Sequence, residues 1–368
     1  MNAEFIEALN VIEKERGVSK EKLIEALEAA LISAYRRNYG NVGNARAEVD
    51  IETGEAKIYA SKAVVEKVEN PLTEVSLENA KRINALYEVG DVIEEEVRPK
   101  NFGRIAAQTA KQVVVQRIRE TERSNAYDEY MEKETEMLTG IVQRVDKTGV
   151  YLSIGRTSGF LDAREIPPGE TYETNMRLKV YVLEVRKTNK GPQVFVSRTH
   201  PGLVKRLFEL EVPEIHAGLV QIKGIAREAG SRTKISVYSN DSRVDAVGAC
   251  VGQKGMRVER IVEELRREKI DIIAWDPDPA IYIAKSLSPA KVLMVYTKPA
   301  KYEENGDRFD GVARVVVPDN QLSLAIGKDG QNARLAVKLT RWKIDIKSNS
   351  QMEEEMERMD SGGETPEI

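Results

Sequence analysis

The pattern of apolar and polar positions predicts that the first third of the chain is mainly helical. Apolar residues at helical spacing predict helices over 2–16, from Leu23 to Ala34 and over Leu77–Leu86. Alternating residues predict a hairpin from Ala45 to Val65, and Asp91–Val97 reads as a further strand. A stretch from Phe102 to Leu138 lacks proline and, after Gly103, glycine, so it predicts one long helix that could join two bodies.

The pattern then changes to short strands at close spacing. Lys147-Thr148-Gly149 and Pro167-Pro168-Gly169 punctuate this region as turns. Five strands in so short a stretch suit a small barrel of the OB type. The predicted strands are Gly140–Val145, Val150–Ile154, Gly159–Asp162, Leu178–Val185 and Val194–Ser197.

The last third contains an internal repeat in the order α-β-β-α-α-β. Its most distinctive part is a turn with two glycines, Gly252-Gln253-Lys254-Gly255, which recurs as Gly327-Lys328-Asp329-Gly330. Helical spacing follows each turn, and each helix leads into the same strand sequence, Lys-Ile-Asp-Ile. Asp276-Pro277-Asp278-Pro279 separates the copies, and so short a spacer predicts that they pack together.

The chemistry of this repeat points to a nucleic-acid backbone. The glycines permit close approach of the main chain, and the N-terminus of the next helix favours an anion. A G-x-x-G loop between two helices is the KH clamp, which holds about four nucleotides of single strand. A plain helical corner is the alternative for either copy alone. The candidate RNA-binding residues are Gly252, Gln253, Lys254, Gly255, Arg257, Gly327, Lys328, Asp329, Gly330 and Arg334.

Asp329 distinguishes the two clamps, because its carboxylate opposes phosphate. We therefore expect the first clamp, with Gln253 and Lys254, to hold RNA more tightly than the second.

The predicted barrel resembles the S-one family of RNA-binding OB barrels but departs from it at two positions. Thr148 stands where an aromatic residue is usual, and Asp162 where the family has histidine. Tyr151 and Phe160 remain for base stacking. A barrel that serves only as a spacer is the alternative.

Composition excludes several classes of protein and of binding site. The 368 residues carry a net charge of −4, with a local excess of +5 over Pro213–Lys347 and of −6 after it. A single cysteine, Cys250, excludes an internal disulfide and a cysteine-rich zinc site. The two histidines, His200 and His216, stand in no catalytic motif. We expect a cytoplasmic monomer without enzymatic activity, cofactor, metal, signal peptide or membrane span, and an acidic, disordered tail after Lys347.

The strings VDAVGACVGQKGMRVERIVEEL, AIGKDGQNARLAVKLTRWKIDI and RPKNFGRIAAQTAKQVVVQRIRE resemble the NusA family of bacterial transcription elongation factors. The resemblance implies that the N-terminal body docks on RNA polymerase near the RNA exit channel. It also implies that the barrel and KH units engage nascent RNA in pausing, intrinsic termination and antitermination, beside other antitermination factors. The basic face that the family uses at the exit channel corresponds here to Arg36, Arg37, Arg104 and Lys111. Some members carry acidic C-terminal repeats, and we expect a short form without them here.

The predicted fold class is α+β and multidomain. An N-terminal polymerase-binding domain with the connecting helix covers 1–135, the OB barrel 136–200, and prokaryotic-type KH domains 201–276 and 277–347, before a tail over 348–368. Two other functions fit the RNA modules. A phosphorolytic RNA-decay enzyme would need larger catalytic domains, and a ribosome-associated RNA chaperone would have no use for a polymerase dock.

Overall fold

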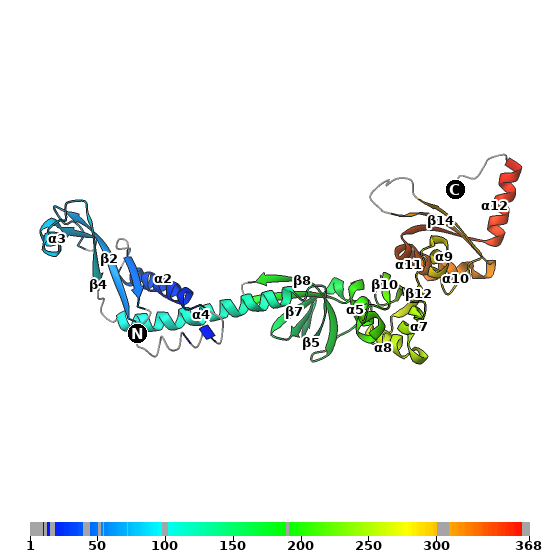
Figure 1. Ribbon diagram of the computed structural model, residues 1–368, viewed down its shortest axis with the longest axis horizontal. Helices are drawn as coiled ribbons and strands as arrows, with labels where there is room; N and C mark the ends of the chain where they lie inside the picture. Colours follow the sequence, from blue (N-terminus) through cyan, green and yellow to red (C-terminus); the bar gives the residue numbers. More distant parts are fainter. Residues whose placement is uncertain are drawn as a thin grey trace. The chain divides into compact units, whose positions relative to one another are not determined.

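We analysed a computed structural model of the chain. The structure describes residues 10, 13–14, 19–39, 45–50, 53, 55–71, 73–97, 102–188, 191–299 and 309–362. The chain divides into two compact units, Met1–Asp128 and Glu129–Ile368, and each is treated by itself below (Figure 1).

The first unit is a small α/β body around one twisted sheet. Strand β2 forms its centre, with β4 antiparallel along one edge and with β1 and β3 along the other. Helix α2 packs Leu23, Leu27 and Leu31 against this sheet, while α3 closes a second small core around Val64. The elements are α2 (Lys20–Tyr39), β1 (Ala45–Val49), β2 (Ala56–Val65), β3 (Glu74–Ser76), α3 (Leu77–Ile83), β4 (Val92–Val97) and α4 (Phe102–Met131). The helix expected over 2–16 lies largely outside the described residues.

Helix α4 is shorter than the sequence predicted. It ends at Met131, and the chain reverses through Thr135, whose φ of 65° is left-handed, before a strand starts at Met137. The helical pattern continued to Leu138, but Met137 and Leu138 pair with the barrel strand that contains Tyr181 and Val180. Non-local sheet pairing therefore overrides a local helical preference here.

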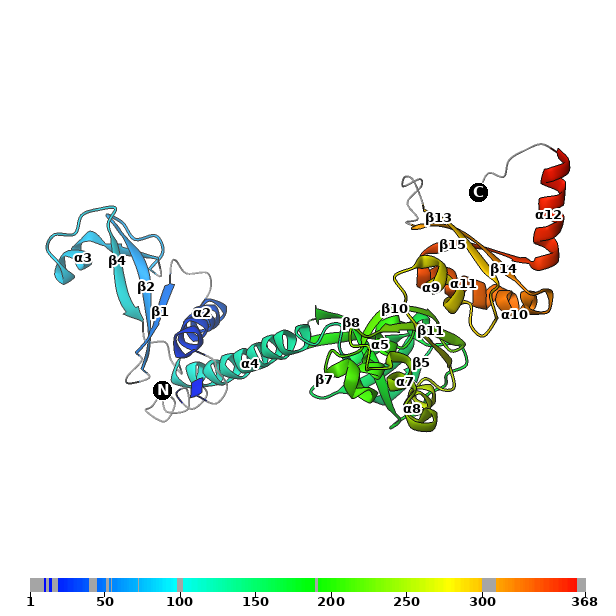
Figure 2. The same cartoon turned by 45° about the vertical axis from the view of Figure 1, so that its right-hand side comes forward.

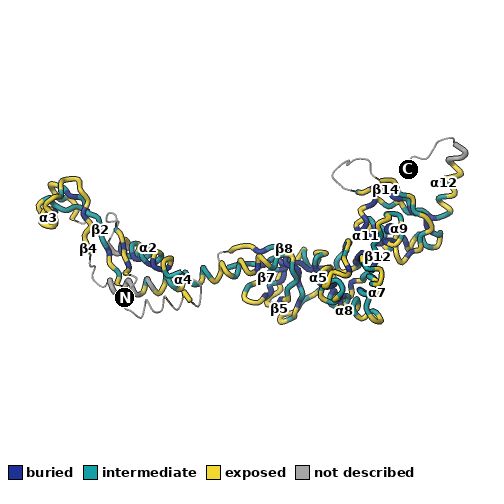
Figure 3. Tube along the Cα trace, viewed as in Figure 1, coloured by how far each residue is buried: buried dark blue, intermediate teal, exposed yellow. Residues whose placement is uncertain are grey.

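The second unit begins with the predicted five-stranded barrel. Its strands close in the order β5-β6-β7-β9-β8, with only the β7–β9 pair parallel. The interior is filled by fully buried aliphatic side chains that include Val142, Leu152, Leu161 and Val180. Figure 3 colours the chain by burial, with buried positions in dark blue. All five predicted strands are present, as β5 (Met137–Asp146), β6 (Gly149–Ile154), β7 (Thr157–Asp162), β8 (Arg177–Thr188) and β9 (Gly191–Ser197), with a 3₁₀ turn η1 (Ala163–Glu165).

The first KH unit follows with the predicted order. In its sheet β11 is central, antiparallel to β10 and parallel to β12. Three helices cover one face of this sheet around a core that includes Leu203, Leu207, Phe208 and Ile261. The elements are α5 (Pro201–Glu211), α6 (Pro213–His216), β10 (Gln221–Glu228), β11 (Arg232–Tyr238), α7 (Ala246–Val251), η2 (Gln253–Gly255), α8 (Met256–Glu264) and β12 (Lys269–Ala274).

The second KH unit repeats this topology (Figure 2). Strand β14 is central, antiparallel to β13 and parallel to β15, and its core includes Ile283, Val315 and Ala336. The elements are α9 (Pro279–Ser286), β13 (Met294–Pro299), β14 (Gly311–Val317), η3 (Asp319–Gln321), α10 (Leu322–Ile326), η4 (Lys328–Gly330), α11 (Gln331–Thr340), β15 (Trp342–Ser348) and α12 (Asn349–Gly362).

The barrel and the first KH unit are joined by a buried arginine. Arg198, whose side chain is 1% exposed, pairs with Glu170 through Nε at 2.7 Å and through Nη2 at 3.0 Å. The same guanidinium donates to the carbonyl oxygens of Lys179 in the barrel and Glu264 in α8. Because every donor that leaves water is paired, this junction holds β8 and α8 in a defined arrangement.

Helix α12 corrects the expectation of a disordered tail after Lys347. It packs against β14 and β15, and its first turn is tied to η3 by the Ser350 hydroxyl, which donates to Asp319 at 2.8 Å. Glu355 forms ion pairs with Arg314 and Lys347. The acidic composition suggested a solvated segment, but these cations offset the charge of the helix.

Candidate nucleic-acid interface

The two glycine loops have the same backbone conformation. The first glycine of each has φ near 75°, with 75° at Gly252 and 77° at Gly327, and ψ near 174° in both. The third and fourth residues are left-handed in both loops. Sequence repetition is therefore accompanied by repetition of the local structure that determines what each loop can bind.

Glycine is required at the first position for two independent reasons. A positive φ with extended ψ is open almost only to glycine. In addition, a Cβ at Gly252 would stand 2.7 Å from Cγ of Arg257, and one at Gly327 would stand 2.8 Å from Cβ of Asn332. At Gly255 a Cβ would meet nothing within 4 Å, so there the side of the loop is open to a ligand.

The dihedral match aligns the loops residue by residue. Lys254 and Asp329 share the left-handed third position, whereas Gln253 and Lys328 share the second. All four side chains are exposed. The lysine is thus the third residue of the first loop and the second residue of the second loop. The left-handed third position holds a cation, Lys254, in the first loop and an anion, Asp329, in the second.

The helix that follows each loop starts without a side-chain cap. Gly255 and Gly330 are the N-caps of α8 and α11, and a glycine cannot cap a helix through its side chain. The first-turn N–H groups and the positive end of the helix dipole therefore point toward the loop, where a phosphate would bind.

Arg257, predicted to contact RNA, is engaged within the protein. Its Nη1 donates to the Ala249 carbonyl at 2.6 Å and to Glu214 at 2.9 Å. At the equivalent position of the second loop, buried Asn332 donates from Nδ2 to the Ala325 carbonyl at 3.0 Å. In both units this position ties the helix before the loop to the helix after it.

Arg334 is also engaged, and its contacts join the two KH units. Its guanidinium holds both carboxylate oxygens of Glu228 in the first unit, at 2.6 and 3.2 Å, and donates to the Asp329 carbonyl at 3.0 Å. Gln331 donates to Glu228 and to Ser231. The hydrogen bond from Arg334, with a further one from Gln331, lowers the pKa of Glu228.

A shared apolar core completes this junction. Ala226 and Ile273, on the sheet of the first unit, pack against Tyr282, Leu335 and Leu339, on helices of the second. The Tyr282 hydroxyl donates to Ser236 at 2.9 Å. The two units are thus packed directly against each other, as the short spacer predicted.

The barrel carries an aromatic row that the sequence revealed only in part. Tyr151 and Phe160 face each other across β6 and β7 with ring centroids 5.0 Å apart, and Phe195 on β9 lies 6.0 Å beyond Phe160. Guanidinium groups stack at both ends of the row, Arg144 on Tyr151 at 4.2 Å and Arg186 on Phe195 at 4.6 Å. Sequence reasoning missed Phe195, because the parallel pairing of β7 with β9 cannot be read from a local pattern.

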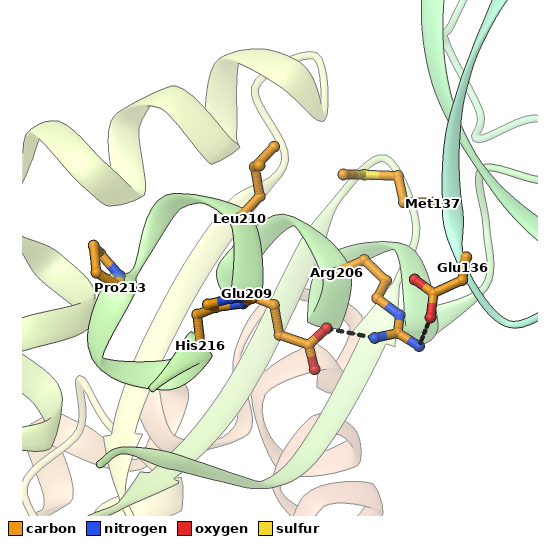
Figure 4. A pocket seen from close by; sticks show the side chains of 7 residues that line it. All are labelled: Glu136, Met137, Arg206, Glu209, Leu210, Pro213 and His216. Atoms are coloured by element: carbon orange, nitrogen blue, oxygen red, sulfur yellow. Dashed lines mark hydrogen bonds and ion pairs between the residues drawn. The ribbon is translucent and has the colours of Figure 1, made fainter. Parts of the chain in front are cut away.

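Neither histidine has the surroundings of a catalytic base. His200 caps α5 through Nδ1, stacks on Tyr181 with ring centroids 4.5 Å apart, and has its pKa lowered mainly by burial. His216 lines an open depression of about 640 Å³, where Arg206 neutralises Glu136 and Glu209 (Figure 4). Burial raises the pKa of Cys250 to about 12, so this thiol is protonated at neutral pH.

Among the described residues, no cluster of three or more metal-ligating side chains is present. No helix in the described ranges has the length and apolarity needed to span a membrane.

Comparison with known proteins agrees with this organisation. Residues 4–124 match the NusA N-terminal domain, 132–197 the S1 RNA binding domain, 198–275 the NusA-like first KH domain and 279–354 the NusA-like second KH domain. The chain is 55% identical over 354 residues to the transcription termination/antitermination protein NusA of Halalkalibacterium halodurans, covering 96% of this chain and 90% of that protein. The chain belongs to the NusA family.

A further relative supports this membership in the NusA family. The protein of the same name from Bacillus subtilis is 54% identical, with 96% of this chain and 93% of the relative covered. The solution structure of the N-terminal domain of NusA from B. subtilis is 55% identical, covers 33% of this chain and 99% of that chain, and gives a TM-score of 0.30.

The basic residues that the family resemblance singled out lie on the two longest helices of the first unit. Arg36 is exposed on α2, and Arg104 and Lys111 are exposed on α4. The side chain of Arg37 lies outside the described residues. Val114 of α4 packs on the core of α2 and β1, so the two helices belong to one body. The role of these residues stays a prediction.

Proposed function

We propose that this protein is a transcription termination and antitermination factor that binds RNA polymerase through its first unit and nascent RNA through its second. In this proposal Arg36, Arg37, Arg104 and Lys111 face the RNA exit channel, and the emerging strand passes to the barrel and the KH clamps. The protein modulates pausing, intrinsic termination and antitermination, without catalysing a reaction and without a cofactor, as a cytoplasmic monomer that also meets other antitermination factors.

The observation that carries the proposal is the pair of G-x-x-G loops with the same left-handed geometry in two KH units that share a core. Two backbone clamps on adjoining units can follow one strand with little entropy lost between sites. The aromatic row of the barrel, flanked by Arg144 and Arg186, supplies a surface on which bases can stack.

The structure also refines the roles proposed for the site residues. Gly252, Gln253, Lys254 and Gly255, with Gly327, Lys328, Asp329 and Gly330, are proposed to meet the RNA backbone directly. Arg257 and Arg334 are proposed to position the loops through Ala249 and Asp329. We propose the domain boundaries 1–135, 136–200 and 201–276, with the second KH domain extended from 277 through α12.

The deciding experiment is the lifetime of a hairpin-stabilised pause by purified bacterial RNA polymerase. The full chain and a fragment of residues 1–128 are each compared with polymerase alone. We expect a longer pause with both, and a larger effect with the full chain, because only the full chain holds RNA. If neither changes the pause and the protein copurifies with ribosomes, the ribosome-associated chaperone replaces this proposal.

A further inference from the structure

The sheets of the two KH units each have a second face, opposite the one that their own helices cover. The strand registers align these faces, since Lys234 pairs with Asp271 in the first unit and Arg314 with Asp345 in the second. The repeated Lys-Ile-Asp-Ile sequence confirms the alignment, because it contains Asp271 in one unit and Asp345 in the other. The two faces can therefore be compared position by position.

In the first unit this face is covered by helices. Ala226 and Ile273 pack under Leu335 and Leu339 of α11, and the buried Lys234 donates to the Ser288 carbonyl just after α9 at 2.7 Å. Glu228, at the corner of the face, receives the guanidinium of Arg334. The face thus works as a docking surface for helices, with an acidic corner that accepts a basic side chain.

In the second unit the equivalent face is largely open. Met294 and Tyr296 of β13 and Val312 of the central β14 are 55%, 39% and 46% exposed. Helix α12 lies at one end of this sheet (Figure 2), where Glu355 forms ion pairs with Arg314 and Lys347.

One corner of this open face carries the opposite charge to the corresponding corner of the first unit. The position of Glu228 is taken by Lys298, because Glu228 lies opposite Arg232 and Lys298 opposite Val312 in the two registers. Lys343 lies beside them, with its amino group 5.2 Å from the centroid of the Phe309 ring. Exposed apolar side chains thus stand beside Lys298, Lys343 and Arg314 on this face, with Asp345 as the acidic residue of its strands. This surface complements a helix with one apolar and one acidic face.

We propose that the open face of the second KH sheet, formed by Met294, Tyr296, Val312, Lys298 and Lys343, binds an acidic amphipathic helix of a partner protein. Two observations favour a helix over RNA. The equivalent face of the first unit already holds helices, and α12, whose sequence contains Glu353, Glu354 and Glu355, contacts this same face.

The test uses the full chain and a synthetic helical peptide with leucine at positions i, i+3, i+4 and i+7 and glutamate elsewhere. A matched peptide with lysine in place of glutamate is the control probe. Binding is followed by fluorescence anisotropy and by the methyl signals of ¹³C-labelled methionines. We expect the acidic peptide to bind and to shift the Met294 signal, and the basic peptide to bind at least tenfold more weakly.

Variants locate the site. Val312→Glu and Lys343→Glu should each weaken peptide binding about tenfold, whereas Lys254→Glu, in the first clamp, should leave it within twofold. The Val312 and Lys343 side chains are exposed. If Val312→Glu or Lys343→Glu fails to fold, Met294→Glu takes its place. Absence of a Met294 shift, equal binding of both peptides, or displacement of the peptide by oligoadenylate RNA with its own Met294 shift would each overturn the proposal.

Discussion

Lys254 and Asp329 occupy the same left-handed position of two loops with the same fold, yet they carry opposite charges. A phosphate held by the first loop gains from the nearby ammonium group, whereas one held by the second meets a carboxylate that Lys328 only partly offsets. The asymmetry between the clamps is thus a property of single residues and is independent of the fold that they share.

This asymmetry gives the first prediction. Lys254→Asp should lower the affinity for single-stranded RNA about tenfold, or ~1.4 kcal/mol, and Lys328→Asp should lower it less. The RNA affinity of each variant is measured by fluorescence anisotropy at several salt concentrations. Lys57→Asp, an equal charge change at an exposed site of the first unit, is the control. Equal losses of RNA affinity in Lys254→Asp and Lys328→Asp would contradict the prediction that the first clamp holds RNA more tightly.

A second prediction concerns Lys234, which is buried with Asp271 3.2 Å away. Burial lowers its pKa from the ordinary 10.5, and Asp271 opposes this only in part. The folded protein therefore releases this proton at a lower pH than the unfolded chain, so stability rises with pH between the lowered pKa and about 10.5.

The measurement is the free energy of unfolding in urea at pH 7 and pH 10, for the natural protein and for Lys234→Met. Other titrating groups contribute equally to the natural protein and to the variant. The difference between their free energies of unfolding therefore isolates the contribution of Lys234. The natural protein should gain stability relative to the variant at the higher pH. Lys343→Met is an exposed control on the other KH unit. A constant difference across pH would contradict the expected effect of burial.

At the scale of elements, the barrel strands decide whether this module binds RNA. Thr148 in place of the usual aromatic residue and Asp162 in place of the usual histidine left a spacer role open, but β9 contributes Phe195 and extends the row to three rings. The bulges in β5 and β8 lie near the arginines that cap the row. A bulge redirects side chains, which is consistent with the way Arg144 and Arg186 lie over the ends of the row.

The prediction that follows is that Phe160→Ala and Phe195→Ala each weaken RNA binding by about 1–3 kcal/mol, the usual loss for one stacked base. Tyr59→Ala is the control, since that ring belongs to the first unit, where it lies under Arg46 at 4.9 Å, and is not part of the barrel. The measurement is affinity for a short single-stranded RNA. Unchanged binding in both barrel variants would return the barrel to the role of a spacer.

At the scale of the whole molecule, Glu228 couples the two clamps. Its carboxylate joins the hairpin of the first KH unit to Arg334, which also holds the backbone of the second loop. The nearby Gly230 lies close to the barrel, since a Cβ there would be 2.8 Å from the Pro168 carbonyl oxygen. Three modules therefore meet around one short turn.

Glu228→Ala should loosen this coupling without altering either clamp. Affinity for an RNA long enough to reach both loops should fall about tenfold, because the second binding event loses effective concentration. Affinity for a four-nucleotide RNA, the length that one clamp holds, should stay the same. Glu66→Ala, an exposed glutamate of the first unit, is the matched control. A parallel loss for both RNAs would mean that Glu228 acts on the loop itself.

The sequence alone determined the local features of this protein. Glycines whose backbone must be left-handed, apolar residues at strand or helix spacing, and the repeated Lys-Ile-Asp-Ile strands were readable because each depends on neighbours within one turn or strand. These features predicted the clamps, the five barrel strands and the order of the KH elements.

The tertiary structure decided what depends on distant residues. The structure shows that the predicted RNA-binding residues Arg257 and Arg334 pair with Glu214 and Glu228, which lie far away in the sequence. Phe195 joined the aromatic row only through parallel pairing of β7 with β9, and β5 shortened helix α4. The acidic tail became a helix because Arg314 and Lys347 meet Glu355. The partners of these side chains are distant in the sequence, so a local pattern cannot predict them. Only the folded chain brings such residues into contact, and those contacts determine which side chains are buried and which form ion pairs.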